Sequence, residues 1–372
     1  MSRAAHSGRA QEQGRGRIPA QSGAGQHRST YLIGEIGQNH NGSVELAKLL
    51  VEIAARPVMD RLFERTFRGF DAVKLTKRDL KEELSEAKMN EPYVSPHSFG
   101  RTYGEHRAML ELTDEQHFEV YTHARSLGID FVETLCAKAC LSLLKLFTPD
   151  YLKVASRDLT NLPLLEAMAE TKLPIILSTG MAGQEELDRA LEVITRYHSR
   201  ITVLHCVSEY PTKYEHVNLN TIPYLKGRYP QYRIGYSDHT IGIAIPLAAV
   251  AAGATMIEKH ITLDRKMKGT DQAGSLGIDG IDRMVRDIRN LDLAFGDYGI
   301  TVEASVSEAR KKLERSIATV RAIEAGEPIT EADIHLLSPG DGFKWVEKTK
   351  VIGKKAKTRI PANEIIYSNL ID

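Results

Sequence analysis

The sequence YSDHT at residues 236–240, followed by MIEKH at residues 256–260, decides the fold of this chain. Both segments end apolar stretches that predict buried strands, and their histidines are His239 and His260. Residues 243–252 between them have the length and the small apolar side chains of a crossover helix. Two parallel neighbouring strands would place the histidines side by side. Because neutral histidine is the commonest metal ligand, the pair predicts a metal site; two histidines satisfied by separate hydrogen bonds are the simpler alternative.

The same alternation of strand and helix extends over most of the chain. Helices are expected at residues 43–55, 113–127, 138–146, 161–170, 183–196, 218–228, 242–252 and 280–295, and strands at residues 30–36, 70–75, 129–134, 151–155, 174–178, 201–206, 232–237 and 255–260. Eight such units in about 270 residues predict an α/β fold, a closed (β/α)8 TIM barrel over residues 30–299. A doubly wound open sheet is the alternative, but no Gly-x-Gly-x-x-Gly motif opens the first helix.

The two ends of the chain differ from this pattern. Residues 1–29 are rich in Gly, Gln, Ser and Arg and nearly lack large apolar side chains, which predicts a disordered N-terminal extension. Residues 300–314 are expected to form a charged connector helix. Residues 315–372 contain short strands and turns and predict a small β-rich domain at the limit of independent stability.

Composition excludes several classes of protein. The formal net charge is +0, so the chain has no basic field that would attract nucleic acid or an anionic membrane surface. The sequence has no run of eighteen apolar residues, and we therefore expect no transmembrane helix. Cys136, Cys140 and Cys206 have no zinc-site spacing and cannot all pair, which favours a reducing, cytoplasmic location. We interpret them as small core residues.

Polar residues gather where the predicted strands end, which is the catalytic face of a barrel. Lys74 and Lys153 each end an apolar strand, where an unpaired charge would be costly. Lysines accompanied by serine and threonine hydroxyls suit a phosphate group. A phosphorylated substrate beside a metal that polarises a carbonyl group indicates carbon–carbon bond formation or cleavage, or phosphate release. The spacing of the residues does not choose between these reactions.

At this point the sequence resembles the sialic acid synthase family, whose members make N-acetylneuraminate and other nonulosonic acids. The resemblance extends over residues 31–372, and its tail resembles the family's SAF, or antifreeze-like, domain through PGDG at residues 339–342. The remaining motifs are IGEIGQNHNG (33–42), AVK (72–74), KVAS (153–156), LSTGM (177–181), HC (205–206), YPT (210–212), SDHT (237–240), EKH (258–260) and KGTD (268–271).

The resemblance implies that phosphoenolpyruvate condenses with an open-chain sugar aldehyde and loses phosphate by C–O cleavage. His239 and His260 would hold Mn²⁺ or Mg²⁺, and Glu35 would handle the proton. Phosphoenolpyruvate would be bound by Lys74, Thr134, Lys153, Ser156, Ser208 and Ser237, of which Ser208 occupies a position that is usually Asn in the family. The acceptor sugar would contact Thr76, Asp158, Tyr210 and Asp271. The resemblance also implies a domain-swapped homodimer, in which each SAF domain caps the partner's barrel.

Departures from the family pattern concern the acceptor. Ser338 stands where the family has an arginine that reaches the N-acetyl group of the sugar, Thr76 replaces Gln, and Arg157-Asp158 replaces Gly-Glu. An arginine side chain can form two parallel hydrogen bonds to the group that it recognises, and serine cannot replace them. We therefore expect an acceptor other than N-acetylmannosamine. The alternatives are a related synthase that uses a sugar phosphate or nucleoside-like aldehyde, and a non-catalytic carbohydrate-binding homologue.

Overall fold

The computed structural model describes residues 29–297 and 299–372. The chain divides into two compact units between Gly296 and Asp297, close to residue 299 where the barrel is expected to end. The predicted N-terminal extension, apart from Ser29, lies outside the described residues. None of the helices in the described part of the chain combines the length and apolar character that a membrane span requires.

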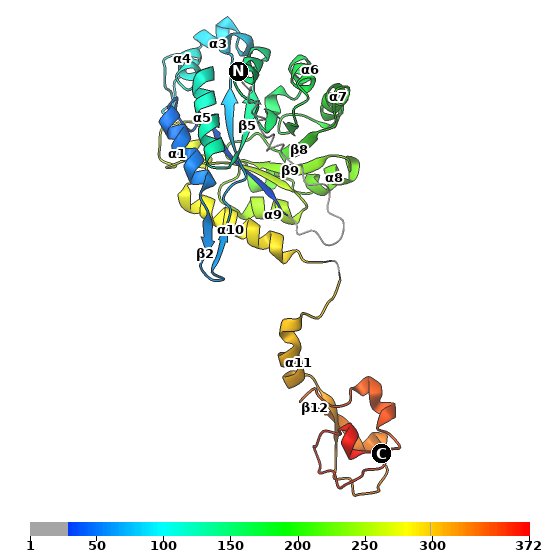
Figure 1. Cartoon of the computed structure of the whole chain (residues 1–372). Helices are drawn as coiled ribbons and strands as arrows, with labels where there is room; N and C mark the ends of the chain where they lie inside the picture. The colour runs from blue at the N-terminus through cyan, green and yellow to red at the C-terminus, as the bar shows by residue number, and fades with distance from the viewer. Residues whose placement is uncertain (1–28, 298) are drawn as a thin grey trace, which may run out of the picture. The chain divides into compact units, whose positions relative to one another are not determined.

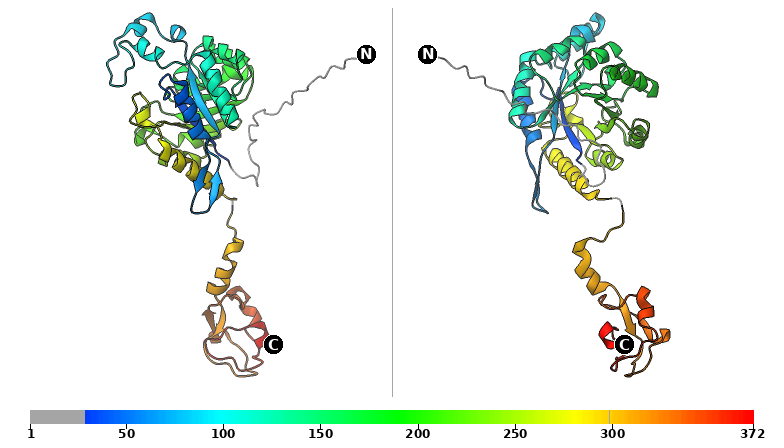
Figure 2. Two further views of the ribbon diagram at one scale, coloured as in Figure 1. Left: turned by 60° about the vertical axis from the view of Figure 1, so that its left-hand side comes forward. Right: turned by 45° about the vertical axis from the view of Figure 1, so that its right-hand side comes forward.

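The first unit is a closed barrel of eight parallel strands, which confirms the predicted fold class (Figures 1 and 2). Strand β10 (Met256–His260) pairs with β1 (Tyr31–Gly37), and this closes the barrel with Glu35 in register with His260. The second strand of the barrel begins two residues later than expected and continues to Lys77, because Thr76 and Lys77 still pair with the next strand. The strands are β1 (Tyr31–Gly37), β4 (Ala72–Lys77), β5 (Asp130–Leu135), β6 (Tyr151–Val154), β7 (Ile175–Ser178), β8 (Ile201–Cys206), β9 (Arg233–Asp238) and β10 (Met256–His260).

Helices cover the outside of the barrel at the positions that the sequence predicts. Side chains cap several of them. Ser43 accepts a hydrogen bond from the first turn of α1 (Val44–Ala55), and Thr113 forms a capping box with Gln116. The segment expected as a helix at 138–146 is instead a 3-10 helix, Lys138–Lys145, whose N-terminus has no side-chain cap. The α-helices are α1 (Val44–Ala55), α5 (Asp114–Ser126), α6 (Leu162–Glu170), α7 (Gln184–Thr195), α8 (Thr221–Arg228), α9 (Ala244–Ala251) and α10 (Ile278–Ala294).

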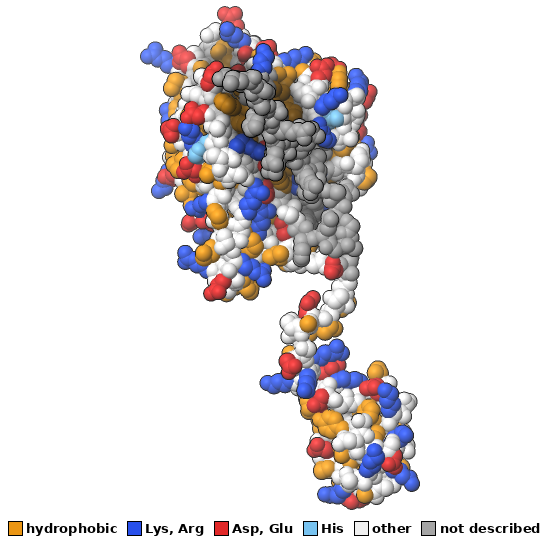
Figure 3. Space-filling model, in the orientation of Figure 1, with side chains coloured by type: hydrophobic (Ala, Val, Ile, Leu, Met, Phe, Trp, Pro, Cys, Tyr) orange, Lys and Arg blue, Asp and Glu red, His pale blue; other side chains and the backbone are white. Residues whose placement is uncertain are grey.

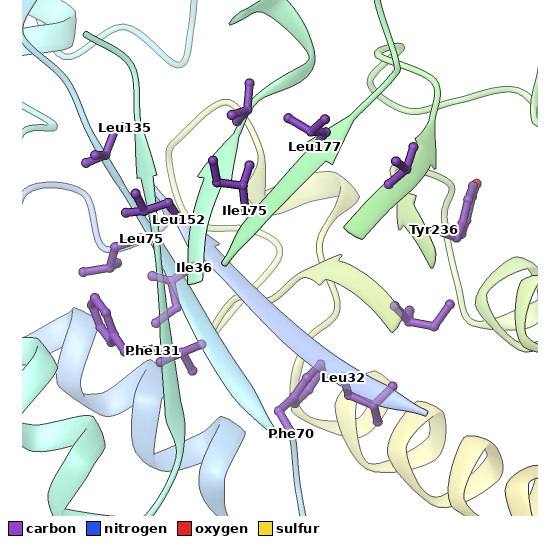
Figure 4. Close-up of a cluster of buried hydrophobic side chains, with 14 of the residues drawn as sticks. Leu32, Ile36, Phe70, Leu75, Phe131, Leu135, Leu152, Ile175, Leu177 and Tyr236 are labelled. Atoms are coloured by element: carbon purple, nitrogen blue, oxygen red, sulfur yellow. The ribbon is translucent and has the colours of Figure 1, made fainter. Parts of the chain in front are cut away.

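The main core lies between the strands and the surrounding helices. Leu32, Ile36 and Phe70 belong to this cluster and are fully buried (Figure 4). Alternate residues of the strands form a separate apolar layer, which consists of Ile33, Ala72, Val132, Tyr151, Ile176, Leu204 and Met256. Since successive strand residues point to opposite faces, this second layer fills the interior of the barrel.

Two insertions extend from opposite ends of the barrel (Figures 1 and 2). Strands β2 (Val58–Asp60) and β3 (Arg65–Phe67) form an antiparallel hairpin that contacts α10. The connection that follows β4 contains three short helices, α2 (Leu80–Glu83), α3 (Glu86–Asn90) and α4 (Tyr103–Ala108). Because it leaves the carboxyl end of a barrel strand, this connection lies on the side where barrel enzymes bind substrates.

The second unit has a small core of its own, formed mainly by isoleucines such as Ile317, Ile329 and Ile366. Helix α11 (Ser307–Leu313) precedes two antiparallel strands, β11 (Ser316–Thr319) and β12 (Ile334–Leu337). The Ser338 hydroxyl, directly after β12, donates to the carbonyl oxygen of Leu313. On the face shown in Figure 3, basic and acidic side chains are interspersed, in keeping with the formal net charge of +0.

Candidate active site

The site is the layer of side chains directly above the apolar interior of the barrel. On each strand, the residue two positions after the member of the apolar layer also points into the barrel interior, because side chains alternate along a strand. These residues are polar or contain sulfur. Ile33 is followed in this way by Glu35, and Met256 by Glu258. The others are Lys74, Thr134, Lys153, Ser178 and Cys206. Strand alternation therefore changes the interior from an apolar floor to a charged chamber at the carboxyl ends.

The chamber forms a cavity of about 400 Å³, within the range of pockets that hold small ligands. Asp158 is the one predicted site residue outside its lining; it is buried beside Arg157, whose Nε lies 3.3 Å from its Oδ2. The predicted residues in the lining are Glu35, Lys74, Thr76, Thr134, Lys153, Ser156, Ser208, Tyr210, Ser237, His239, His260 and Asp271.

Two lysines and two carboxylates form a buried ion network at the base of the cavity. Lys74 Nζ lies 2.8 Å from Glu35 Oε2 and 3.7 Å from Glu258 Oε2. Lys153 Nζ lies 3.7 Å from the other oxygen of Glu258, Oε1. Glu258 therefore bridges the two ammonium groups, and it also accepts a hydrogen bond from Ser237 Oγ at 2.9 Å. Two ammonium groups thus face two carboxyl groups in the buried network.

The two carboxyl groups have opposite pKa shifts. Burial raises the pKa of Glu35, and the neighbouring Glu258 raises it further, against the opposing effect of Lys74. Burial also acts to raise the pKa of Glu258, but Lys153 and Lys74 outweigh it and hold that pKa below its usual range. Glu258 is therefore the permanent anion of the network, whereas Glu35 can exchange a proton nearer neutral pH, as a general acid or base requires.

His239 and His260 lie together at the mouth of the barrel, with ring centroids 5.7 Å apart. His239 Nδ1 lies 2.9 Å from the carbonyl oxygen of Val207, which it reaches as a donor and so leaves Nε2 as the nitrogen with a lone pair. His260 Nδ1 is buried and has no hydrogen-bond partner among the described residues. Burial lowers the pKa of His260 and keeps its imidazole neutral, the form that binds metals.

These observations fit a divalent cation held by two imidazoles. Across residues 29–297 and 299–372 there is no cluster of three or more His, Cys, Asp or Glu side chains suited to a metal. A cation at the histidine pair would thus take its remaining ligands from substrate oxygens or water. The Tyr210 ring, 4.1 Å from the His239 ring between centroids, borders the same place.

Several cavity residues were not predicted from the sequence as site residues. Gln38, Arg78 and Arg107 line the cavity, as do Ser178 and Glu258, and Arg157 was noted only as a departure from a family pattern. Strand alternation was the signal that could have found three of them: Ser178 and Glu258 follow the apolar layer by two residues, and Arg78 follows Lys74 and Thr76 at the same spacing. Gln38 and Arg107 lie outside strands and give no such signal.

Two cysteines that we expected in the core lie in the cavity wall. Cys136 and Cys206 line the cavity, whereas Cys140 belongs to the main core. Cys206 Sγ lies 3.8 Å from His239 Nδ1 and 3.6 Å from Ser156 Oγ. The cysteines therefore contribute small, polarizable surface to the site.

Gly180 makes a close approach that shapes the cavity. A methyl group at this position would lie 2.4 Å from Ser208 Oγ and 2.8 Å from Ser156 Oγ. The Gly180 amide donates to Ser156 Oγ at 3.0 Å. The Ser156 hydroxyl in turn donates to Cys206 Sγ at 3.6 Å, a weak acceptor.

Other charges near the strand ends face the helices. Lys259 is fully buried and forms an ion pair with Asp238. Glu133 lies next to Thr134 in β5 but points the other way, and its Oε2 is 3.1 Å from His117 Nδ1 of α5. These pairs stabilise the wall of the barrel and take no part in the cavity.

Comparisons with known proteins cover both units. Residues 65–299 match the NeuB family and residues 314–371 match the SAF domain. N-acetylneuraminate-9-phosphate synthase of Homo sapiens is 31% identical over 350 residues, 94% of each chain. N,N'-diacetyllegionaminic acid synthase of Campylobacter jejuni is 34% identical over 344 residues, 91% of this chain and 99% of that one. The crystal structure of N-acetylneuraminic acid (sialic acid) synthetase from Leptospira borgpetersenii gives a TM-score of 0.64 at 30% identity, covering 77% of this chain and 92% of the other.

Proposed function

The chain belongs to the NeuB family, and we propose that it joins phosphoenolpyruvate to an open-chain sugar aldehyde, releases phosphate and so forms a nonulosonic acid. It is a transferase of the synthase type, in line with relatives named as synthases of N-acetylneuraminate 9-phosphate and N,N'-diacetyllegionaminic acid. The observation that carries the proposal is the convergence of Lys74, Lys153 and Glu35 with the histidine pair in one cavity.

Phosphoenolpyruvate would bind over the buried ion network. Its phosphate and carboxylate groups need cationic and hydroxyl donors, which Lys74 and Lys153 supply together with Thr134, Ser156, Ser208 and Ser237. Lys74 Nζ already donates to Thr134 Oγ1 at 3.1 Å, and Lys153 Nζ to Ser178 Oγ at 2.6 Å, so both ammonium groups are held in fixed positions. This preorganisation favours anion binding because little reorganisation is left to the moment of binding.

His239 and His260 would hold Mn²⁺ or Mg²⁺, which supplies Lewis-acid polarisation of the acceptor carbonyl when it is bound. C3 of phosphoenolpyruvate forms a bond to the aldehyde carbon, the aldehyde oxygen gains a proton, water adds at C2, and the C–O bond to phosphate breaks. Glu35 is the group that moves the proton, at the forming alcohol or at the water. Its raised pKa and its 2.8 Å contact with Lys74 allow it to hold or release that proton inside the cavity.

The acceptor would lie against Thr76, Tyr210 and Asp271, all in the cavity lining. Asp158 would act on the acceptor only through Arg157, with which it is paired. Ser338 replaces the arginine expected in the family, and its hydroxyl is engaged by Leu313 of its own unit. We therefore expect an acceptor other than N-acetylmannosamine, bound in a homodimer whose SAF domains cap the partner barrels. Three free, buried cysteines support a cytoplasmic location for this enzyme.

The test is phosphate release from phosphoenolpyruvate in the presence of Mn²⁺, with N-acetylmannosamine, with a panel of other aldoses and with no acceptor. We expect acceptor-dependent release that His239→Ala lowers by at least about 100-fold, the scale seen when a transition-state contact is removed. Efficient turnover of N-acetylmannosamine alone would refute the shifted acceptor. Failure of every aldehyde would refute the synthase and favour a carbohydrate-binding protein.

A further inference from the structure

Asp238 and Lys259, on the outer face of the barrel wall, are the immediate chain neighbours of the two histidines in the cavity. Asp238 is the last residue of β9 and precedes His239, and Lys259 precedes His260, the last residue of β10. The two strands pair in parallel with Lys259 directly opposite Asp238. Because successive strand residues point to opposite faces, this pair lies behind the cavity that the histidines line.

The pair forms a charged cross-link that is closed to solvent. The side chains of Asp238 and Lys259 are 0% and 1% exposed. Lys259 Nζ donates to Asp238 Oδ2 and also to the carbonyl oxygen of Thr240. These two acceptors lie on either side of His239 in the sequence. One ammonium group of β10 therefore holds the chain both before and after His239.

The Asp238 carboxylate stabilises the same bend from within. Its Oδ1 accepts hydrogen bonds from the Thr240 amide at 3.1 Å and from the Tyr236 hydroxyl at 3.0 Å. Its Oδ2 accepts a hydrogen bond from Thr240 Oγ1 at 3.1 Å, in addition to the one from Lys259. Each carboxylate oxygen thus has two donors, and the bend that contains His239 is fixed on both sides.

The hydrogen-bond ladder of the sheet does not by itself position His239. The last pair between β9 and β10 joins Asp238 to Lys259, so His239 lies one residue beyond that ladder. His260, in contrast, still pairs with β1. The position of one imidazole relative to the other therefore depends on contacts outside the ladder. The cross-link is one of them, and the Thr212 amide, which donates to the carbonyl oxygen of His239 at 3.0 Å, is another.

A buried ion pair is a costly way to hold two strands together. Removing two charges from water costs free energy that their attraction repays only in part, and apolar side chains of similar size often stabilise a protein as well or better. Charge-assisted hydrogen bonds add a defined geometry, which apolar contacts do not. A functional site needs that definition, because a displacement of about 1 Å can cost about 100-fold in rate.

We propose that Asp238 and Lys259 are positioning residues, which set the separation and direction of the His239 and His260 imidazoles and thereby the affinity of the site for a divalent cation. This inference rests on the proposed function, which assigns the cation to the histidines, and it adds the residues that hold those histidines in place. Neither Asp238 nor Lys259 lines the cavity, so the pair acts only through its neighbours. A merely structural pair would affect stability alone.

The test removes both charges and keeps the volume of the side chains. Asp238→Asn combined with Lys259→Met retains an acceptor for the Thr240 amide and leaves no unpaired charge. Co²⁺ is the probe, because it binds imidazole more tightly than Mn²⁺ does and its visible absorption depends on ligand geometry. We expect the double variant to have a Tm close to that of wild type. It should bind Co²⁺ about 10- to 100-fold more weakly, with an altered absorption spectrum.

Glu133→Gln is the matched control. Glu133 is likewise a buried, outward-facing carboxylate of a barrel strand, but it pairs with His117 of α5. The control should keep the Co²⁺ affinity of wild type even if its Tm falls. Unchanged affinity in the double variant, or an equal loss in the control, would overturn the proposal.

Thr240→Val is the second variant, in case the double variant does not fold. It removes one hydrogen bond to Asp238 and changes no charge. We expect Co²⁺ binding to weaken about 10-fold, the lower end of the same range. Wild-type affinity in Thr240→Val would overturn the proposal.

Turnover separates this inference from the proposed function. With phosphoenolpyruvate and an acceptor that wild type uses, the double variant should need about 10- to 100-fold more Mn²⁺ for half-maximal rate, with kcat at saturating Mn²⁺ within about 3-fold of wild type. Weaker Co²⁺ binding in the variant, with no turnover by wild type, would support the positioning role and refute only the synthase. Turnover by wild type, with an unchanged cation requirement in the variant, would overturn only the positioning role.

Discussion

Glu258 offers a sharp test of the claim that the two lysines form the anion site. Its carboxylate lies 3.7 Å from Lys74 Nζ and 3.7 Å from Lys153 Nζ, and it is buried. Each ion pair at this separation contributes about 4 kcal/mol at an effective dielectric constant of about 20. Glu258→Gln loses both pairs but avoids the cost of burying the carboxylate, so we expect a net loss of about 3–5 kcal/mol of stability.

The perturbation has a second consequence that a purely structural network would not have. For a unit of this size, a loss of about 3–5 kcal/mol lowers Tm by roughly 6–10 °C. Without Glu258 the two ammonium groups attract an anion more strongly. If Glu258→Gln binds phosphoenolpyruvate roughly tenfold more tightly than wild type, the same ligand concentration stabilises the variant by about 1.4 kcal/mol more. The ligand should then raise the Tm of the variant by about 3 °C more than it raises the Tm of wild type.

The assay is thermal unfolding with and without phosphoenolpyruvate, in wild type and in Glu258→Gln. Glu133→Gln is the matched control, because Glu133 is also a buried barrel carboxylate but pairs with His117 outside the cavity. We expect the control to lose stability while its stabilisation by phosphoenolpyruvate stays that of wild type. A ligand-induced shift in Glu258→Gln equal to or smaller than that of wild type would refute the reasoning.

Three further predictions follow from single residues. Burial raises the pKa of Glu35 in the native state, so its ionisation costs stability as pH rises above about 4 and through the native pKa. Glu35→Gln has no such ionisation, and the difference in Tm between this variant and wild type should therefore grow in favour of the variant as pH rises from 5 to 8. A constant difference would contradict the raised pKa. Gly180→Ala should raise KM for phosphoenolpyruvate about 10-fold or more, since the new methyl group displaces Ser208 and Ser156, whereas an unchanged KM in steady-state kinetics would exclude those hydroxyls from the site. Ser338→Arg should increase kcat/KM for N-acetylmannosamine about 10-fold if the missing arginine is what excludes that sugar, and no gain in the phosphate-release assay would refute this explanation.

The barrel could be predicted because its signal is repeated. Val, Ile and Leu runs recur as strands, and helices follow them. His260 ends β10 and His239 directly follows β9, and the structure pairs these two strands in parallel. The same regularity places Lys74 within β4 and Lys153 next to the last residue of β6, and both lie in the cavity. Residues whose position depends only on strand alternation were therefore accessible from the sequence.

The positions of Arg107 and Asp158 could not be predicted in the same way. Arg107 reaches the cavity from a helix within an irregular connection, where sequence spacing does not determine side-chain direction. Asp158 was expected at the acceptor, but it is the last residue of a short 3-10 helix and pairs with Arg157. The bridging role of Glu258 depends on distances between strands, which periodicity does not give.

The most direct measurement is mass spectrometry of a reaction that contains the enzyme, phosphoenolpyruvate, Mn²⁺ and the mixed aldoses and aldose phosphates, run beside His260→Ala. The account predicts a new acid whose mass equals one acceptor plus pyruvate, formed in step with phosphate release and absent from the variant. Phosphate release without any acceptor-linked acid, or an acid formed equally well by His260→Ala, would contradict it.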